Sequence, residues 1–404
     1  MNDVLRSLNL HVEVYSPLHI GSGERIPYKL LLLDDDSLTV VDEGKLIDWA
    51  AKDEKRSDRL VAFFEDPKQS LSDFLQQNRS ISLQQVQKYQ ITNNAVGKGM
   101  LSEVLEFIKT SGAPYLPGSS VKGVLRSALI RGFLLESRST LEQVQQKAAE
   151  VIGEHAKGVA FGKKSRAKPG GVIEPLVMVP NSGIKSGKYP NYDISRAIQL
   201  GDAPPVSPQS LQLSEVRLFS LNQKGALAYK GNFSIFAETI PLQTEFDLPM
   251  TINSYLFQSP AVEQLGFADR QALIGKLAGY CKSASNELID QEIDFYANAG
   301  ERRLKEFYEN LKAEQADFKS AFFLPLGWGS GYDAKTITDL LGESTFQQVV
   351  DVYQNTQRLG KPSGSGAWLG AKRTPKSRKV AVGKDGIPCP LGWVKITLQV
   401  VRAA

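Results

Sequence analysis

The chain has 404 residues, of which 42% are hydrophobic and 23% charged, values typical of a globular protein. These proportions exclude a disordered tail, a coiled coil and a collagen, and no apolar stretch approaches the roughly 20 residues that a membrane-spanning helix needs. The start of the chain lacks the pattern of a signal peptide, and its two cysteines, Cys281 and Cys389, lie far apart. We therefore expect a soluble cytoplasmic protein of about two domains, without a disulfide framework, a zinc–cysteine site or membrane association.

The net charge of +4 is small, but basic residues are concentrated in three stretches. Residues 113–131, 155–196 and 371–384 hold many more lysines and arginines than acidic residues, whereas acidic residues are common in 34–48. A local excess of cations can neutralise phosphates, although it is also found in solvated loops. Because all three stretches are rich in glycine or proline or lie beside such loops, we interpret them as favouring a polyanionic partner.

The first half of the chain mixes both kinds of secondary structure. Apolar and polar residues alternate in 8–15, which predicts a half-buried strand, and Gly21–Gly23 predicts a flexible loop. The following patterns predict a hairpin at 30–41, a mostly helical insertion at about 45–90, a strand near 104–108, a loop at 117–120, helices at about 121–135 and 141–152, and strand-like runs at 172–179 and 194–200.

The second half repeats this mixture. We expect strands at 211–219, 232–240 and 246–252, a helical insertion at about 261–316, a strand at 322–325, a glycine loop at 327–331, a helix from about 335 and a final alternating strand at 394–400. The fold class is therefore α+β with mostly antiparallel sheets. We place the domain boundary near Pro204, giving domains of residues 1–204 and 205–404.

The segment Pro117–Arg126 carries the strongest local signal. A serine is expected to cap a helix here, and Lys122 and Arg126 lie four residues apart on one helix face. A helix N-terminus with nearby cations favours a phosphate, although an ordinary capped surface helix fits the same pattern.

The loop Gly327–Gly331 does not complete a known nucleotide motif. A Walker A loop needs a glycine immediately before its lysine, and Ala334 precedes Lys335. The segment 364–369 likewise lacks the third glycine of a dinucleotide fingerprint. No nucleotide or other cofactor is therefore expected.

No catalytic or metal-binding set is evident either. Three histidines occur, without a spacing suited to a metal. His19, beside the first glycine loop, could act as a general acid or base on RNA, but we expect it to pack or to form hydrogen bonds within the loop.

In this order, four segments resemble the RAMP superfamily of CRISPR-associated RNA-binding proteins: 16–23, 114–126, 194–202 and 326–331. With this length, the chain is similar to the subunit of type III-A (Csm-type) effectors that caps the 3′ end of the guide RNA. The resemblance implies two RRM-like (ferredoxin-like) domains, each with helical or loop insertions, that contact the backbone of single-stranded RNA. It also implies the crRNA, the target RNA, a neighbouring RAMP backbone subunit and other Csm-complex subunits as partners, with one copy per complex, in antiviral defence.

The resemblance and the basic segments together predict the residues that line the RNA path: His19, Gly21, Ser22, Gly23, Ser119, Ser120, Lys122, Arg126, Lys163, Lys164, Arg166, Gly327, Gly329 and Gly331. The three glycines of the last loop could instead only support the fold.

One departure from the family concerns catalysis. In the repeated backbone subunits an aspartate soon after the first glycine loop cuts target RNA with a metal, whereas here 24–29 follows the loop and the next aspartates lie in the hairpin turn 34–36. We therefore expect a non-catalytic subunit that supports crRNA maturation and assembly. Two alternatives stay open: a metal-independent RAMP endoribonuclease that uses His19 to process guide RNA, and a structural RAMP subunit of a type III-B effector.

Overall fold

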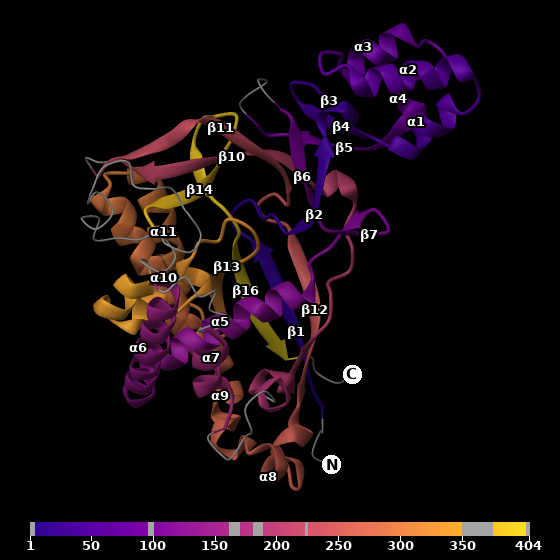
Figure 1. Cartoon of the computed structure of the whole chain (residues 1–404). Helices are drawn as coiled ribbons and strands as arrows, with labels where there is room; N and C mark the ends of the chain where they lie inside the picture. The colour runs from indigo at the N-terminus through magenta and orange to yellow at the C-terminus, as the bar shows by residue number, and fades with distance from the viewer. Residues whose placement is uncertain are drawn as a thin grey trace.

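The computed structural model describes residues 5–95, 101–160, 170–180, 189–222, 225–349 and 375–400. Two sheets lie at the centre of the molecule, with helices on one side and a separate group of short helices at the far end (Figure 1). Most neighbouring strands are antiparallel, so the α+β class is confirmed. Within the described ranges, every helix is too short or too polar to cross a membrane.

The first sheet has five strands, and each pair of adjacent strands in it is antiparallel. Their order is β13 (Ala321–Pro325), β16 (Trp393–Val400), β1 (Leu5–Val14), β12 (Glu245–Asn253) and β9 (Ile198–Leu200). The alternation predicted for the first strand is confirmed, since Leu8, Leu10, Val12 and Val14 are buried.

Two long helices, α5 (Gly118–Glu136) and α10 (Leu277–Asn298), pack on the buried face of this sheet and against each other. Their contact is close enough to require a glycine. A Cβ atom added to Gly132 would lie 1.9 Å from the carbonyl oxygen of Tyr280, so any side chain there would force the helices apart.

The second sheet joins nine strands of the described chain. Its main path is β2 (Gly21–Pro27), β6 (Glu103–Phe107), β11 (Leu227–Thr239), β10 (Gln212–Leu221), β5 (Gln87–Asn93), β4 (Ser37–Val41) and β3 (Leu31–Leu33). Strand β14 (Ser377–Val382) also pairs with β10, and β15 (Pro388–Pro390) pairs with β14. A two-stranded ribbon, β7 (Lys109–Thr110) and β8 (Ala113–Pro114), lies beside it.

The stretch predicted to be mostly helical, at about 45–90, contains α1 (Glu43–Ala50), α2 (Glu54–Glu65), α3 (Leu71–Gln77) and α4 (Leu83–Val86). Side chains cap three of these helices, as their sequences favour: Asp42, Asp53 and Ser70 each accept a backbone N–H. The buried Lys29 fastens the insertion to the sheet, because its ammonium donates to the carbonyl oxygens of Phe63, Asp66 and Gln69.

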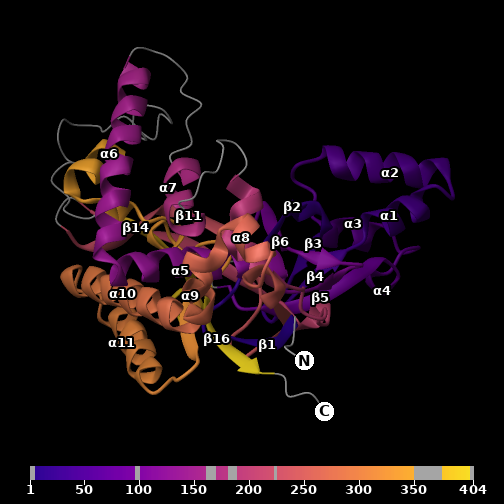
Figure 2. The same ribbon diagram turned by 90° about the horizontal axis from the view of Figure 1, so that it is seen from below.

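Further labelled helices are α6 (Arg138–Ala160), α7 (Gly170–Met178), α8 (Ala261–Leu265), α9 (Gln271–Gly275) and α11 (Arg302–Ala316). Seen from below, α5, α6, α10 and α11 lie on the opposite side of the sheets from α1–α4 (Figure 2). An apolar cluster that includes Phe219, Tyr308, Phe323 and Trp393 joins α10 and α11 to both sheets.

Three local predictions were wrong. Residues 172–179 form the helix α7 rather than a strand, because Ile173, Val177 and Met178 are buried at helical spacing against α5 and α6. The helix expected from about 335 starts later, because residues 333–335 and 338–341 form 3₁₀ turns and the α-helix begins only at 343. Residues 194–200 begin as a 3₁₀ turn and only their last three form a strand.

The boundary predicted near Pro204 stays a prediction. Strands from both sides of it pair in each sheet: β1 with β12 and β16, and β5 with β10. The two parts of the chain therefore share their sheets.

Candidate nucleic-acid interface

The first and third glycine loops, some 300 residues apart in sequence, lie against each other. The N–H of Trp328 donates to the carbonyl oxygen of His19 at 2.8 Å, and the two rings meet edge to face at 5.7 Å. A Cβ added to Gly327 would lie 2.3 Å from that same oxygen, and one added to Gly329 would lie 2.7 Å from the Leu391 side chain. These two glycines therefore allow the close approach of the loops, whatever else they contact.

His19 is buried, with 2% of its surface exposed. Its Nδ1 lies 2.7 Å from the carbonyl oxygen of Glu238, which can only accept, so Nδ1 carries the proton. The other ring nitrogen, Nε2, faces Gly21, and a Cβ atom added to Gly21 would lie 3.1 Å from it. Burial, with a smaller contribution from the charge of Lys109, lowers the pKa of His19. The structure thus shows a neutral histidine that packs and forms a hydrogen bond.

A buried ion pair lies behind this histidine. Lys109 Nζ and the fully buried Glu238 carboxylate are 2.5 Å apart, and that carboxylate also accepts from the Tyr89 hydroxyl and from the N–H of Phe107. The sequence contained no signal for this group, because its members come from four separate strands. Together they hold the strand whose carbonyl oxygen orients His19.

The exposed part of the first loop is a bulge in β2 rather than the free loop that we predicted. The strand pairing with β6 is irregular between Gly21 and Arg25, and Gly23 has a φ of +95° with open space around it. Gly21, Ser22 and Gly23 are all exposed. The bulge therefore presents backbone to solvent that a ligand could approach closely.

The second motif packs against 194–202, another of the four resembling segments. Helix α5 begins at Gly118, whose N–H donates to the Asp202 carboxylate at 2.7 Å. A Cβ added to Gly118 would lie 2.4 Å from the carbonyl oxygen of Gly201. The expected serine cap is wrong, because Ser119 and Ser120 are inside the helix and Asp202 caps it across space.

An open cleft of about 740 Å³ lies between the start of α5 and β9. Its lining includes Ser119 and Lys122 from the helix, Arg196 and Gln199 from the 194–202 segment, and Asn253 at the end of β12. Ser119, Arg196 and Gln199 are exposed, and the Lys122 ammonium donates to the carbonyl oxygen of Ile198 at 2.7 Å. Burial lowers the pKa of Lys122. No sequence pattern marked Arg196, Gln199 or Asn253 as site residues. They reach the cleft because the segment 194–202 packs on α5.

Arg126 is differently placed. Its guanidinium forms ion pairs with Glu174 and, at 2.9 Å, with Asp193, so its charge is already compensated. Lys163, Lys164 and Arg166 lie outside the described residues. Of the predicted cations that the structure describes, Lys122 is the one that faces an open cleft.

The exposed face of the five-stranded sheet is polar and acidic between β1 and β12. Asn9 and His11 form hydrogen bonds with the Asp247 carboxylate, and Glu245 lies beside them. RRM-type sheets that bind RNA bases commonly use aromatic side chains on this face. The acidic character here does not favour a polyanion.

The aspartate turn 34–36 behaves as a solvated hairpin connection. Asp34 accepts from Ser37, and Asp36 pairs with Lys384 on the surface. Among the described residues, no group of three or more histidine, cysteine or acidic side chains is placed to hold a metal ion.

Comparison with known proteins agrees with this arrangement. The family model of the RAMP superfamily matches residues 11–332, and the chain belongs to this superfamily. Along most of its length it is similar to the CRISPR system protein Csm5 of Methanocaldococcus jannaschii, with 23% identity over 97% of this chain and 89% of that protein. It is also similar to Csm5 of Streptococcus thermophilus, with 29% identity over 32% of this chain and 40% of that protein.

Solved structures share the fold. A chain of the cryo-EM structure of a Csm–crRNA–target RNA ternary complex from a type III-A CRISPR–Cas system matches with a TM-score of 0.67 and 22% identity, covering 97% of this chain and 100% of that one. The crystal structure of T. onnurineus Csm5 matches with a TM-score of 0.61 and 18% identity, covering 95% of this chain and 99% of that one.

Proposed function

We propose that this protein is a non-catalytic RNA-binding subunit of a type III-A (Csm) effector, which binds the crRNA near its 3′ end. The observation that carries the proposal is the cleft between α5 and β9, where two of the four RAMP-like segments meet. Lys122 and Arg196 supply positive charge there, and Ser119, Gln199 and Asn253 supply neutral hydrogen-bonding groups. Such a set suits phosphates and riboses, which position an RNA without reading its sequence.

The assembly partners follow from the relatives. The chain is similar over nearly its whole length to Csm5 proteins and to a chain of a complex that contains crRNA and target RNA. We propose the crRNA, the target RNA, a neighbouring RAMP subunit and the other Csm subunits as partners, with one copy of this chain per complex in the cytoplasm. The type III-B alternative has less support, because both solved neighbours are of the Csm type.

The state of His19 supports the non-catalytic assignment. A general acid or base must reach the proton that it transfers, and this ring is buried between Phe107 and Trp328 with Nδ1 engaged by a carbonyl. The lowered pKa also disfavours the protonated imidazole that a general acid needs. The endoribonuclease alternative would need this site to open.

The five-stranded sheet supports one of the two proposed RRM-like domains. The strands β16, β1, β12 and β9 are adjacent in this order, α5 follows β1, and α10 follows β12. With all four antiparallel, this is the order of a ferredoxin-like β–α–β–β–α–β unit, in which β13 forms an additional edge strand.

A salt titration of RNA binding tests the cleft. Lys122→Ala combined with Arg196→Ala should weaken binding of single-stranded RNA equally for all sequences. The slope of log affinity against log salt should fall by about 1.4, because each lost phosphate contact on a single strand contributes about 0.7. The control is Lys305→Ala with Lys312→Ala, which removes the same charge from exposed ion pairs on α11. An unchanged slope in the cleft variant would remove the cleft from the RNA path.

Two further measurements address the finer points. End-labelled RNA incubated with the protein should stay intact both in EDTA and in Mg²⁺, and cleavage in either would refute the non-catalytic assignment. In an assembled complex, the cleft variant should leave the 3′ end of the crRNA more sensitive to an added exonuclease. Equal protection with the wild-type protein would refute the placement at the 3′ end.

A further inference from the structure

Two lysines beside the third glycine loop have no acidic partner. Lys335 is exposed, and its ammonium lies 3.0 Å from the carbonyl oxygen of Gly327. The Lys379 ammonium lies 5.1 Å from the centre of the Trp328 ring. Burial and the charge of Lys379 both lower the pKa of Lys335, so the two cations are close enough to repel each other. Within the described part of the chain, neither lysine has a carboxylate at ion-pair distance.

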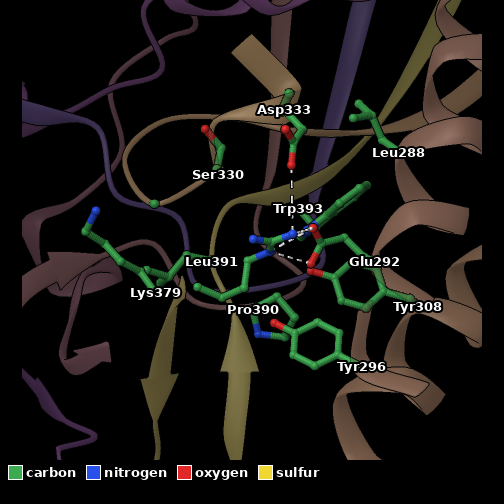
Figure 3. A pocket seen from close by; sticks show the side chains of 14 residues that line it. Leu288, Glu292, Tyr296, Tyr308, Ser330, Asp333, Lys379, Pro390, Leu391 and Trp393 are labelled. Carbon is green, nitrogen blue, oxygen red and sulfur yellow. Dashed lines mark hydrogen bonds and ion pairs between the residues drawn. The ribbon is translucent and has the colours of Figure 1, made fainter. Parts of the chain in front are cut away.

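The nearest carboxylates serve another cation. Glu292 forms hydrogen bonds with the Arg378 guanidinium at 2.9 and 3.0 Å, and Asp333 lies 3.8 Å from it. In Figure 3 the Lys379 side chain extends away from Glu292 and Asp333. Arg378 and Lys379 are consecutive residues of β14, so their side chains point to opposite faces of the strand. The acidic groups therefore neutralise Arg378 on the inner face and leave the lysine pair uncompensated on the other.

Aromatic rings lie on the same side of the sheet. Trp328 packs with Val216, Ile235 and Ala381, which mark the face that Lys379 shares. Phe233 lies on β11, two residues before Ile235, and its side chain is 70% exposed.

The strand register places the bulge that contains Phe233 one strand away from Lys379. Residues 230–233 form a bulge in β11, because Arg217 pairs with Ser234 and Phe219 with Tyr229. This bulge lies opposite Leu218, and Leu218 pairs with Lys379 on its other side. Among the described residues, Phe233 is the large hydrophobic side chain with the greatest exposed fraction.

We propose that Lys335, Lys379, Trp328 and Phe233 form a second contact site for single-stranded RNA, separate from the α5–β9 cleft. The two ammonium groups bind phosphates, and the exposed ring of Phe233 stacks on a base. Electropositive grooves with interleaved aromatic rings bind single strands in this way without sequence preference. The bound phosphate also relieves the repulsion between the lysines. The choice of RNA as the ligand rests on the proposed function. The site itself does not depend on the α5–β9 cleft, because none of its residues lines that cleft.

The test compares two charge-matched double variants of the full-length protein. Lys335→Gln with Lys379→Gln keeps a donor near the Gly327 carbonyl, and Lys305→Gln with Lys312→Gln is the control on α11. The probe is fluorescein-labelled oligouridine, whose anisotropy is measured from 0.05 to 0.3 M KCl. We expect the first variant to bind about 25-fold more weakly at 0.1 M, which follows from two contacts of about 0.7 each in the salt slope. The control should change affinity less than twofold.

Two single variants separate the site from loop stability. Lys379→Gln touches no hydrogen bond of the loop and should weaken binding about fivefold. Phe233→Ala should weaken it about tenfold and leave the salt slope unchanged, because stacking releases no counterions. Wild-type affinity and slope in the double variant and in Lys379→Gln would overturn the proposal.

The outcomes also distinguish this site from the cleft. A loss only in the lysine-pair variant would support this site and refute the cleft, and a loss only in the Lys122→Ala, Arg196→Ala variant would do the reverse. Repeating the comparison on assembled complexes identifies the strand. A defect before target addition assigns the site to the crRNA, and a defect only after it assigns the site to the target RNA.

Discussion

Replacement of Gly327 by alanine tests whether the contact between the first and third glycine loops holds this part of the fold. Gly327 has a φ of +78°, which alone costs an alanine about 1–2 kcal/mol. Its new Cβ would also lie 2.3 Å from the carbonyl oxygen of His19, so the loops must separate. Separation breaks the hydrogen bond from Trp328 to His19, worth about 0.5–1.5 kcal/mol. We expect a total loss of about 1.5–3.5 kcal/mol.

The matched control is Gly331→Ala in the same loop. Gly331 has a φ of +90° but nothing within 4 Å of an added Cβ, so only the conformational cost of about 1–2 kcal/mol remains. Hydrogen–deuterium exchange reports on the contact directly through the amide of Trp328. We expect Gly327→Ala to exchange this amide at least tenfold faster than Gly331→Ala and to melt at a lower temperature. Equal exchange and melting in the two variants would refute the reasoning.

Three further predictions concern buried ionisable groups. Arg131→Met leaves the Asp339 carboxylate without its bidentate partner and should lower the free energy of unfolding by about 3–5 kcal/mol, measured by chemical denaturation; a loss under 1 kcal/mol would contradict it. Burial raises the pKa of Asp333 to about 6, so the folded state binds this proton more tightly than the unfolded state, and stability is lost as the pH rises from about 4 to 6. The melting temperature of Asp333→Asn should therefore exceed that of the wild type increasingly over this range, and a constant difference would exclude this residue as the cause. Burial also raises the pKa of both thiols, that of Cys389 to about 12, so Ellman's reagent at pH 8 should react slowly with the buried Cys281 and the half-buried Cys389 until the protein unfolds; immediate reaction of either thiol would contradict its raised pKa.

Local patterns predicted most of the secondary structure. Strict alternation identified β1 and β16, and the helical spacing of apolar residues identified the stretch that forms α1–α4. The failures occurred where packing outweighed propensity. The β-branched residues of 172–179 favoured a strand, but burial of Ile173 and Val177 on one face against α5 and α6 made the segment helical.

The candidate site was predicted only in part. The sequence drew attention to the loops at 19–23, 117–126 and 327–331, because glycine, serine and lysine have recognisable roles near phosphates. It did not show that Arg126 would be neutralised by Glu174 and Asp193, since both partners lie more than 40 residues away. Arg196 was noted as part of a basic stretch and of the RAMP-like segment 194–202, and its place in the cleft follows from the packing of that segment on α5.

By itself, the sequence determined the α+β class, the order of most elements and the four segments that identify the superfamily, because these depend on short-range periodicity and on residue type. Only the tertiary structure decided which segments meet. Contacts such as that of Gly327 with His19 and that of Gly118 with Gly201 depend on missing side chains that let two backbones approach. The balance of charge was decided in the same way: Arg126 and Arg378 are compensated by distant carboxylates, whereas Lys335 and Lys379 are left uncompensated.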